Sequence, residues 1–391
     1  MSPEPRPPGL RVLYVIDSLV PGGAERSLLA LAPRYAERDI DLEVAYLHDR
    51  TGLRQQFTDA GVSLHSLAGS GGRMGWIWRT QQLLERRRPD IVHTTLFEAD
   101  LAGRVAAGLR HRPVVSSLVN IAYGPEMLRD PGLRSWKVRE ARLADTVTCR
   151  WVRRFHAVSD HVGEVMAKRL CIPRHKIDVI PRGRDLEALG SPTPDRRTRV
   201  RAELRLPSDA PVLFVAARQE RQKGIDVVLL AMPRILEALP AARLVIAGRE
   251  GNDTPRIRST VTELRLDDAV TFLGVREDIG GLLCASDAFV SPSRWEGFPG
   301  AVLEAMAMGT PIVATDLPMV REAVGDERCA WLVPPDRPAA LAAASIDALT
   351  KPSLAEERAS AARQRFNEHF TIDRVADQMV AFYHRALTVS S

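Results

Sequence analysis

The chain has 391 residues, of which 45% are hydrophobic and 26% charged, and its formal net charge is +5. These values are typical of a globular protein and exclude wholesale disorder, and the length favours two domains over one core. Four cysteines without Cys-x-x-Cys spacing argue against a disulfide framework or a structural zinc site.

Residues 1–8 lack the apolar segment of a signal peptide, and no apolar run approaches the ~18 residues of a transmembrane helix. We therefore expect a cytoplasmic protein.

The positive charge is distributed unevenly along the chain. Residues 1–185 contain 29 Lys and Arg against 21 Asp and Glu, whereas the remainder contains 25 against 28. A basic N-terminal half is suited to a membrane surface, a nucleic acid or an anionic substrate. An arginine-rich habit of the whole genome explains the same composition equally well, so the sequence leaves both explanations open.

Short apolar runs alternate with helical patterns in the first half of the chain, which is typical of βα units around a parallel sheet. The predicted strands are residues 11–16, 42–47, 91–93, 114–117, 155–159 and 177–181, and residues 24–37 form the first helix. Residues 185–211 are polar and rich in Pro and Arg. We expect this stretch to be an interdomain linker that leads into a short helix.

The same alternation begins again after this stretch. Its predicted strands are residues 212–216, 244–247, 270–273, 288–291, 311–315 and 331–333, and residues 225–239 form its first helix. We therefore predict an α/β protein with two Rossmann-like, doubly wound domains that face a central cleft. Ligands bind open parallel sheets at the carboxyl ends of the strands, so this cleft is the expected site.

Two glutamates bracket a glycine-rich turn in the second half. Glu296 precedes Gly-Phe-Pro-Gly, and Glu304 lies in the helical run 301–308 that follows. The glycines let a ligand approach the backbone, and the start of a helix presents unpaired N–H groups to an anion. The carboxylates flank this anion site and are suited to sugar hydroxyls. A Gly-Pro turn followed by an amphipathic helix with incidental acids is the alternative interpretation.

A basic loop directly follows the predicted strand 212–216. It contains Arg218 and Lys223, and Gly224 leads into the next helix. Two cations at the carboxyl end of a strand form a positive pocket that can neutralise the charge developing on a leaving diphosphate. A solvated basic loop is the alternative.

Small residues also follow the first predicted strand. Gly22 and Gly23 open the helix 24–37, and they permit close approach of a phosphate or a sugar to the start of that helix. A Gly-Gly turn alone is a weak signal, because it lacks the Gly-x-Gly-x-x-Gly spacing of a dinucleotide site.

Together these segments resemble the motifs of the retaining glycosyltransferases of family 4, which have the GT-B fold. Residues 296–304 match the Glu-x7-Glu motif of that family. Residues 217–224 match its Gly-Arg-x4-Lys-Gly segment, with Ala217 where glycine is usual, and residues 22–25 match its Gly-Gly-Ala-Glu loop. The resemblance covers about residues 10–385.

The resemblance implies a domain of residues 1–187 and a nucleotide-sugar-binding domain of residues 188–370. A C-terminal helix within residues 371–391 is expected to pack back onto the first domain. The implied reaction moves a sugar from a nucleotide diphosphate sugar to an acceptor hydroxyl and retains the anomeric configuration. Neither a metal ion nor a cofactor is expected, and no nucleic acid is an expected partner.

The resemblance also assigns roles to individual residues. Arg218 and Lys223 are expected to stabilise the leaving diphosphate, and Glu296 to hold the hydroxyls of the donor sugar, which makes these three the catalytic residues. Glu304 is expected to bind the ribose diol. The other expected donor-binding residues are Gly22, Gly23, Arg249, Val275, Gly297, Phe298, Pro299 and Gly300.

Three positions in the first half depart from the family pattern. His93 matches the first histidine of a Val-His-x-His strand end, but Thr95 replaces the second. Asn120 lies where many relatives have a histidine near the donor sugar, and an amide there can only form hydrogen bonds. Arg182 replaces the usual Asn of a Val-Ile-Pro-Asn-Gly stretch. We predict substrate contacts for His93, Asn120 and Arg182. A packing role is the alternative for His93, and capping of the linker is the alternative for Arg182.

Tryptophans beside arginines suggest a membrane contact in the first half. Trp76 and Trp78 precede the arginine run 86–88, and Trp136 and Trp151 also have basic neighbours. Trp beside Arg is typical of an interfacial contact, while buried Trp with solvated arginines is the alternative. Family members build cell-surface polysaccharides, lipid-linked glycans or glycosylated metabolites. We therefore expect an acceptor of one of these kinds and a location in the cytoplasm or on the inner face of the membrane.

Two other functions are compatible with the sequence. A nucleotide-sugar 2-epimerase has the same two-domain fold and cleaves the same bond, but it needs no acceptor. A non-catalytic nucleotide-sugar-binding protein is the second alternative, which the unusual residues Val119 and Asn120 leave open. The Gly-Gly-Ala-Glu loop and the intact acidic and basic motifs favour sugar transfer.

Overall fold

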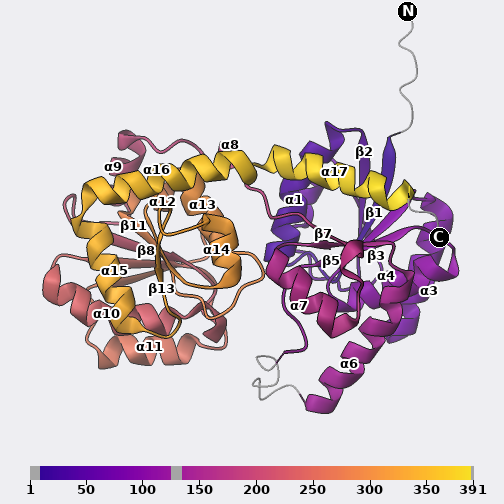
Figure 1. The fold of residues 1–391 in the computed structure, drawn as a ribbon, viewed down its shortest axis with the longest axis horizontal. Coiled ribbons are helices and arrows are strands. Elements are labelled where there is room, and N and C mark those ends of the chain that lie inside the picture. The colour runs from indigo at the N-terminus through magenta and orange to yellow at the C-terminus, as the bar shows by residue number, and fades with distance from the viewer. Residues whose placement is uncertain (1–8, 125–133, 389–391) are drawn as a thin grey trace, which may run out of the picture. The chain divides into compact units, whose positions relative to one another are not determined.

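The structure, a computed structural model, describes residues 9–124 and 134–388. The chain forms two compact units (Figure 1). Unit 1 comprises Met1–Gly183 and Ile372–Ser391, and unit 2 comprises Arg184–Thr371. Residues 1–8, where we expect no signal peptide, and residues 389–391 of the predicted C-terminal helix lie outside the described residues.

The described part of unit 1 contains a seven-stranded parallel sheet in the order β3-β2-β1-β4-β5-β6-β7. Its strands are β1 (Leu10–Ile16), β2 (Ile40–Tyr46), β3 (Ser63–Ser66), β4 (Ile91–Thr95), β5 (Val114–Leu118), β6 (Arg154–Ala157) and β7 (Ile177–Val179). The sequence pattern does not predict β3. This strand lies at the edge of the sheet and is only partly buried, so it lacks the apolar run of a central strand.

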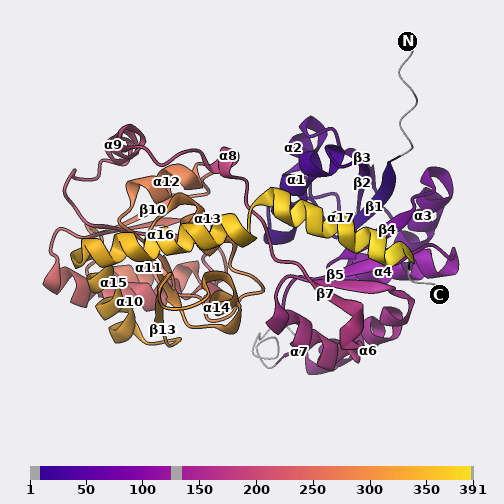
Figure 2. The ribbon, with the colours of Figure 1, turned by 45° about the horizontal axis from the view of Figure 1, so that its top comes forward.

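Helices cover this sheet, as Figure 2 shows. They are α1 (Gly23–Ala36), α2 (Arg54–Asp59), α3 (Gly72–Arg87), α4 (Phe97–Leu109), α6 (Ser135–Thr148) with the 3-10 turn η1 (Cys149–Trp151), α7 (Asp160–Leu170) with η2 (Arg174–Lys176), and α17 (Ile372–Thr388). The C-terminal helix α17 packs against α1, and both contribute to one apolar core with β1 and β2. Elsewhere in unit 1, α3 and α6 both contact α4.

The described part of unit 2 contains a six-stranded parallel sheet in the order β10-β9-β8-β11-β12-β13. Its strands are β8 (Val212–Ala216), β9 (Arg243–Ala247), β10 (Val270–Gly274), β11 (Ala288–Ser291), β12 (Ile312–Thr315) and β13 (Trp331–Val333). β8 and β11 are central neighbours, and most of their residues are buried. The predicted α/β class with two Rossmann-like parallel sheets is confirmed.

The helices of unit 2 are α8 (Leu186–Leu189), α9 (Pro194–Glu203), the 3-10 turn η3 (Arg221–Lys223), α10 (Ile225–Ala238), α11 (Thr254–Glu263), α12 (Ile279–Ala285), α13 (Gly300–Met308), α14 (Pro318–Val324), α15 (Pro338–Thr350) and α16 (Pro352–His369). The stretch 185–211 that composition predicts to be a linker contains α8 and α9 and belongs to unit 2. Two of its arginines, Arg197 and Arg201, form ion pairs with Asp287, so the polar composition reflects tertiary contacts.

Among residues 9–124 and 134–388, no helix has both the length and the apolar character needed to cross a membrane.

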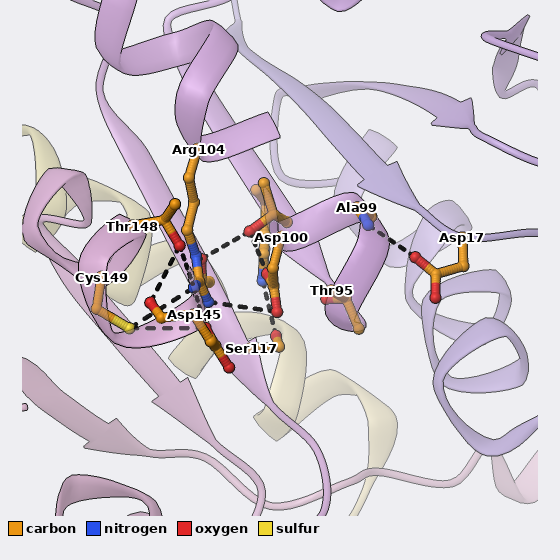
Figure 3. Close-up of polar contacts among 12 residues, drawn as sticks. Asp17, Thr95, Ala99, Asp100, Arg104, Ser117, Asp145, Thr148 and Cys149 are labelled. Atoms are coloured by element: carbon orange, nitrogen blue, oxygen red, sulfur yellow. Dashed lines mark hydrogen bonds and ion pairs between the residues drawn. The ribbon is translucent and has the colours of Figure 1, made fainter. Parts of the chain in front are cut away.

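A buried ion cluster joins α4 to α6 in unit 1 (Figure 3). Arg104 of α4 is fully buried and forms ion pairs with Asp145 of α6 (2.5 Å) and with Asp100 one turn earlier (3.3 Å). Its Nε also donates a hydrogen bond to Ser116 of β5. Burial raises the pKa of Asp100 to about 7, and the charge of Arg104 opposes this effect. The cluster fixes two helices and a strand through one guanidinium group.

Replacing Arg104 with Met should destabilise the protein strongly. The substitution leaves two carboxylates buried without their counter-charge, which costs about 3–5 kcal/mol of unfolding free energy. Urea unfolding followed by circular dichroism measures this change. Arg328→Met is the matched control, because it breaks an exposed pair with Asp326 and should change stability far less. A loss no larger than that of the control would contradict the structural role of Arg104.

Candidate functional site

The basic loop and the acidic turn of unit 2 meet at the carboxyl ends of β8 and β11. Lys223 of η3 donates a hydrogen bond from Nζ to Glu296 Oε1 at 2.5 Å, and the two side chains are 19% and 9% exposed. Ser293 Oγ donates to the same carboxylate oxygen at 2.8 Å. A cavity of about 30 Å³ lies here and is lined by Lys223, Glu296, Pro299 and Gly300 among others. The structure thus brings together the predicted lysine and the first predicted glutamate.

Close backbone contact holds these two loops together. Gly224 has a φ of +63°, and a Cβ at this position would lie 2.0 Å from the carbonyl oxygen of Pro292. Only glycine fits such a conformation at such a distance without displacing backbone. Gln222 Nε2 adds a hydrogen bond to the carbonyl oxygen of Trp295 at 2.9 Å. Lys223 therefore lies on a loop whose backbone path is fixed by contact with the loop that follows β11.

An ion pair that the sequence analysis misses also supports this arrangement. Arg294 donates two hydrogen bonds to the carboxylate of Asp226 in α10, at 2.9 and 2.7 Å. Burial raises the pKa of Asp226, but the hydrogen bonds and charges of Arg294 and Arg256 outweigh burial and lower it below its ordinary value. The two residues are 68 positions apart. No local pattern in the sequence indicates such a pair.

The turn between the glutamates leads directly into α13. This helix begins at Gly300, so Glu304 lies in its second turn. Phe298 and Pro299 are buried, and the ring of Phe298 packs on that of Phe370 with centroids 5.8 Å apart. Glu304 Oε1 accepts a hydrogen bond from Arg184 Nε at 2.7 Å. No sequence motif predicts a role for Arg184.

The other predicted donor-side residues of unit 2 follow neighbouring strands. Arg218 comes after β8, Arg249 after β9 and Val275 after β10, and all three are exposed. Within the part of the chain that the structure describes, neither arginine side chain forms a hydrogen bond or ion pair. Gly248 lies so close to Ala217 that a Cβ would be 1.9 Å from its carbonyl oxygen. These residues share one edge of the sheet, and their contacts with a donor stay predictions.

In unit 1 the structure brings Arg182 to the start of α1. Gly22 is the residue before α1, and a Cβ on Gly23 would lie 2.3 Å from Nη1 of Arg182. The guanidinium group therefore lies against the first turn of the helix. A Cβ on Gly22 would meet the carboxylate of Glu25 at 2.4 Å. Asn120, which follows β5, is exposed.

His93 is buried in unit 1 and belongs to a chain of hydrogen bonds. His156 Nε2 donates to the carbonyl oxygen of Ile180, so its Nδ1 accepts from Ser117 Oγ (both 2.8 Å). Ser117 Oγ in turn accepts from His93 Nε2 at 2.7 Å, and His93 Nδ1 accepts from Tyr383 Oη at 2.8 Å. Burial lowers the pKa of His93 well below its ordinary value, and the His156 charge adds to this effect.

A small cavity adjoins this chain. Its volume is about 40 Å³, and Tyr14, His93, Val119, His156 and Arg182 are among the residues that line it. This volume holds about one water molecule. The structure thus places His93 and Arg182 around one cavity in unit 1, while a substrate contact of either stays a prediction.

The tryptophans of unit 1 divide into two groups. Trp78, Trp136 and Trp151 are exposed, whereas Trp76 is partly buried and packs edge-on against His48 with centroids 5.1 Å apart. Some neighbouring arginines are engaged in ion pairs, since Arg87 binds Glu43. The exposed tryptophans fit a surface contact, and Trp76 is a packing residue.

The described residues contain no group of three or more His, Cys, Asp or Glu side chains arranged to hold a metal ion.

Two parallel-sheet units, with a basic loop and an acidic turn at the carboxyl edge of the second, define the GT-B class of glycosyltransferase architecture. HepE of Anabaena, crystallised with UDP and glucose, has the same fold, with a TM-score of 0.85 and 21% identity over 96% of this chain and all of that chain. The chain matches the family models "Glycosyl transferases group 1" over residues 196–365 and "Glycosyltransferase Family 4" over residues 21–188.

Two relatives extend the comparison. Glycogen synthase of Mycobacterium tuberculosis is 30% identical over 310 residues, which are 76% of this chain and 69% of that protein. The UDP-Gal:alpha-D-GlcNAc-diphosphoundecaprenol alpha-1,3-galactosyltransferase of Escherichia coli is 30% identical over 238 residues, 60% of each chain. The chain belongs to the family 4 glycosyltransferases, and the expected family is confirmed.

Asp17 lies directly after β1, and the shift in its pKa can be tested by measuring stability at different pH values. Burial raises its pKa to about 6, although a hydrogen bond from Ala99 N (2.8 Å; Figure 3) opposes the shift. A raised carboxyl pKa contributes stability below the unfolded value of about 3.9, and this contribution is lost as the pH rises through about 6. Asp17→Asn removes the titration and retains an acceptor oxygen.

The unfolding free energy of the Asn variant, relative to the unaltered protein, should therefore rise between pH 4 and pH 7. We expect about 1–2 kcal/mol, because solvent screens part of the effect. Urea unfolding at several pH values measures this difference. A difference that does not vary with pH would show that Asp17 titrates normally.

Proposed function

We propose that the protein transfers a sugar from a nucleotide diphosphate sugar to an acceptor hydroxyl and retains the anomeric configuration. The ion pair between Lys223 and Glu296, next to the start of α13, is the observation that carries this proposal. It places a cation and a carboxylate beside helix N–H groups, and these are the groups that a diphosphate joined to a sugar needs. Membership of family 4 supports the retaining outcome.

Four side chains of unit 2 have roles in the proposed reaction. Arg218 and Lys223 stabilise the negative charge that develops on the leaving diphosphate, together with the N–H groups at the start of α13. Glu296 accepts hydrogen bonds from the donor sugar, and Glu304 accepts them from the ribose diol. The leaving phosphate takes the proton of the acceptor hydroxyl on the same face of the sugar, so no protein nucleophile is required.

The two cations take the place that a metal ion has in other transferases, so we propose that turnover needs no metal and no cofactor. Chelation with EDTA should then leave the rate unchanged.

The donor can be identified with a panel of nucleotide sugars, with release of the nucleoside diphosphate as the readout. The name of the Escherichia coli relative specifies a UDP-sugar donor, so UDP-sugars are the first donors to test.

Two alternatives make different predictions for this assay. A 2-epimerase converts the donor into an epimer without an acceptor, whereas a transferase consumes donor fully only when an acceptor is present. A non-catalytic binding protein would bind nucleoside diphosphate and release none from any donor.

The acceptor is proposed to be lipid-linked, with unit 1 contacting an anionic membrane from the cytoplasmic side. The side chains of Leu109, Leu143, Val147 and Trp151 are all exposed, and we propose that they form one apolar patch. Leu143, Val147 and Trp151 follow one another at four-residue spacing, and Trp151 lies against Gly108 at the end of α4. Exposed arginines flank them, among them Arg139, Arg142 and Arg150. Apolar side chains with arginine neighbours suit the interface of an anionic bilayer.

Substituting one residue of the acidic motif and one residue of the basic loop tests the site directly. Glu304→Ala and Lys223→Ala should each lower kcat/KM for the donor by about 10²–10³, because each removes a group that stabilises the bound donor or leaving group. The rate of nucleoside diphosphate release measures the loss, and circular dichroism confirms the fold. Arg328→Ala, on an exposed loop of the same unit, is the control. Turnover close to that of the unaltered protein in both variants would overturn the site assignment.

Introducing a negative charge into the apolar patch tests the membrane contact. Leu143→Glu and Trp151→Glu should each abolish cosedimentation with vesicles that contain phosphatidylglycerol, since a carboxylate is repelled from an anionic, apolar surface. Leu230→Glu is the matched control, because Leu230 is an exposed leucine on α10 of unit 2. Equal binding of all variants, or no binding of the unaltered protein, would contradict the proposal.

A further inference from the structure

Arg184 occupies a particular place in the chain, because it is the first residue of unit 2. Its backbone N–H donates a hydrogen bond to the carbonyl oxygen of Phe370 at 2.9 Å. It also forms an isolated parallel bridge with Thr371, the last residue of the same unit. The backbone of Arg184 is therefore fixed to the segment in which the chain leaves unit 2.

The side chain of Arg184 extends from this fixed backbone to α13. Its Nε donates to Glu304 Oε1 at 2.7 Å, and the two side chains are 19% and 20% exposed. A Cβ on Gly300 would lie 2.0 Å from Nη2 of Arg184. The guanidinium group thus covers the first residue of α13 while it holds the glutamate one turn later.

Phe370 connects the same residues from the other side. Its carbonyl oxygen binds the N–H of Arg184, and its ring packs against Phe298 of the turn that precedes α13. The backbone hydrogen bond, the aromatic packing and the ion pair therefore all connect Arg184 and Phe370 with the segment 298–304. An arginine whose backbone is fixed in this way loses little conformational freedom when it binds a carboxylate, so it can hold that carboxylate in one orientation.

We propose that Arg184 is a positioning residue that orients Glu304 for the ribose diol of the donor. This inference rests on the proposed function of Glu304. Arg184 occupies Oε1, which directs Oε2 toward hydroxyl groups of the ligand. A preorganised carboxylate binds a diol more tightly than one that must first be ordered. Arg184 lies 120 positions before Glu304, directly after the stretch 179–183 that resembles Val-Ile-Pro-Asn-Gly.

Calorimetric titration with UDP, GDP and ADP tests this role without requiring turnover. With the tightest of these ligands, Arg184→Met should raise Kd about tenfold, since a charge-assisted hydrogen bond to Glu304 is lost. Arg184→Lys should give an intermediate Kd, because lysine retains the charge but cannot form the planar fork. In donor turnover, KM should rise to a similar extent while kcat changes less than about threefold.

A double-mutant cycle separates positioning from direct contact. Glu304→Gln should itself weaken binding, and in that background Arg184→Met should change Kd by less than about twofold, because there is no carboxylate left to orient. Arg328→Met is the control and should bind as the unaltered protein does. Thermal unfolding shows whether each variant is folded, and Arg184→Gln replaces the Met variant in the cycle if the latter does not fold.

The outcomes distinguish this inference from the function on which it rests. An unchanged Kd in Arg184→Met, or a full tenfold effect that persists in the Glu304→Gln background, would overturn the positioning role alone. Failure of the unaltered protein to bind any of the three nucleoside diphosphates would overturn the proposed function and the inference together.

Discussion

The close approach of two loops in unit 2 is the constraint on which the candidate donor site depends. Gly224 touches the carbonyl oxygen of Pro292, and this contact sets Lys223 beside Glu296. Attraction between the two charges would not suffice, because the cost of removing both from water offsets much of the attraction in a pair this buried. The backbone brings the charges together, and the parallel pairing of β8 with β11 brings the loops together.

The same constraint explains which parts of the fold can be predicted from the sequence. Central strands such as β8 and β11 are buried on both faces, so they are continuous apolar runs that stand out in a polar chain. The edge strand β3 has no such run and is missed. Residues 185–211 resemble a linker in composition. Arg197 nevertheless pairs with Asp287, and a polar side chain in the sequence does not reveal a partner 90 positions away.

Within the site, the motif residues and their supports differ for the same reason. Lys223, Glu296 and Glu304 are recognisable because their spacing within short segments matches a family pattern. Ser293 donates to Glu296 from only three positions before it. The supporting residues Arg294 and Arg184, in contrast, act through contacts set by the tertiary fold. Arg294 reaches Asp226 in α10, and Arg184 reaches Glu304 across 120 positions. A single sequence carries no periodicity or spacing that indicates contacts of this range.

The two units use their polar groups differently, and this difference bears on where specificity lies. In unit 1, both ring nitrogens of His93 are engaged by Tyr383 and Ser117, and Arg104 is fully buried among carboxylates. Groups satisfied in this way stabilise a unique core, and a ligand must break existing bonds to use them. In unit 2, Glu304 and Lys223 are also held in ion pairs, with Arg184 and Glu296, but both remain partly exposed at the edge of the sheet. The proposed donor site therefore uses partly exposed side chains, whereas the proposed acceptor contacts of unit 1 use exposed surfaces more than its buried histidines.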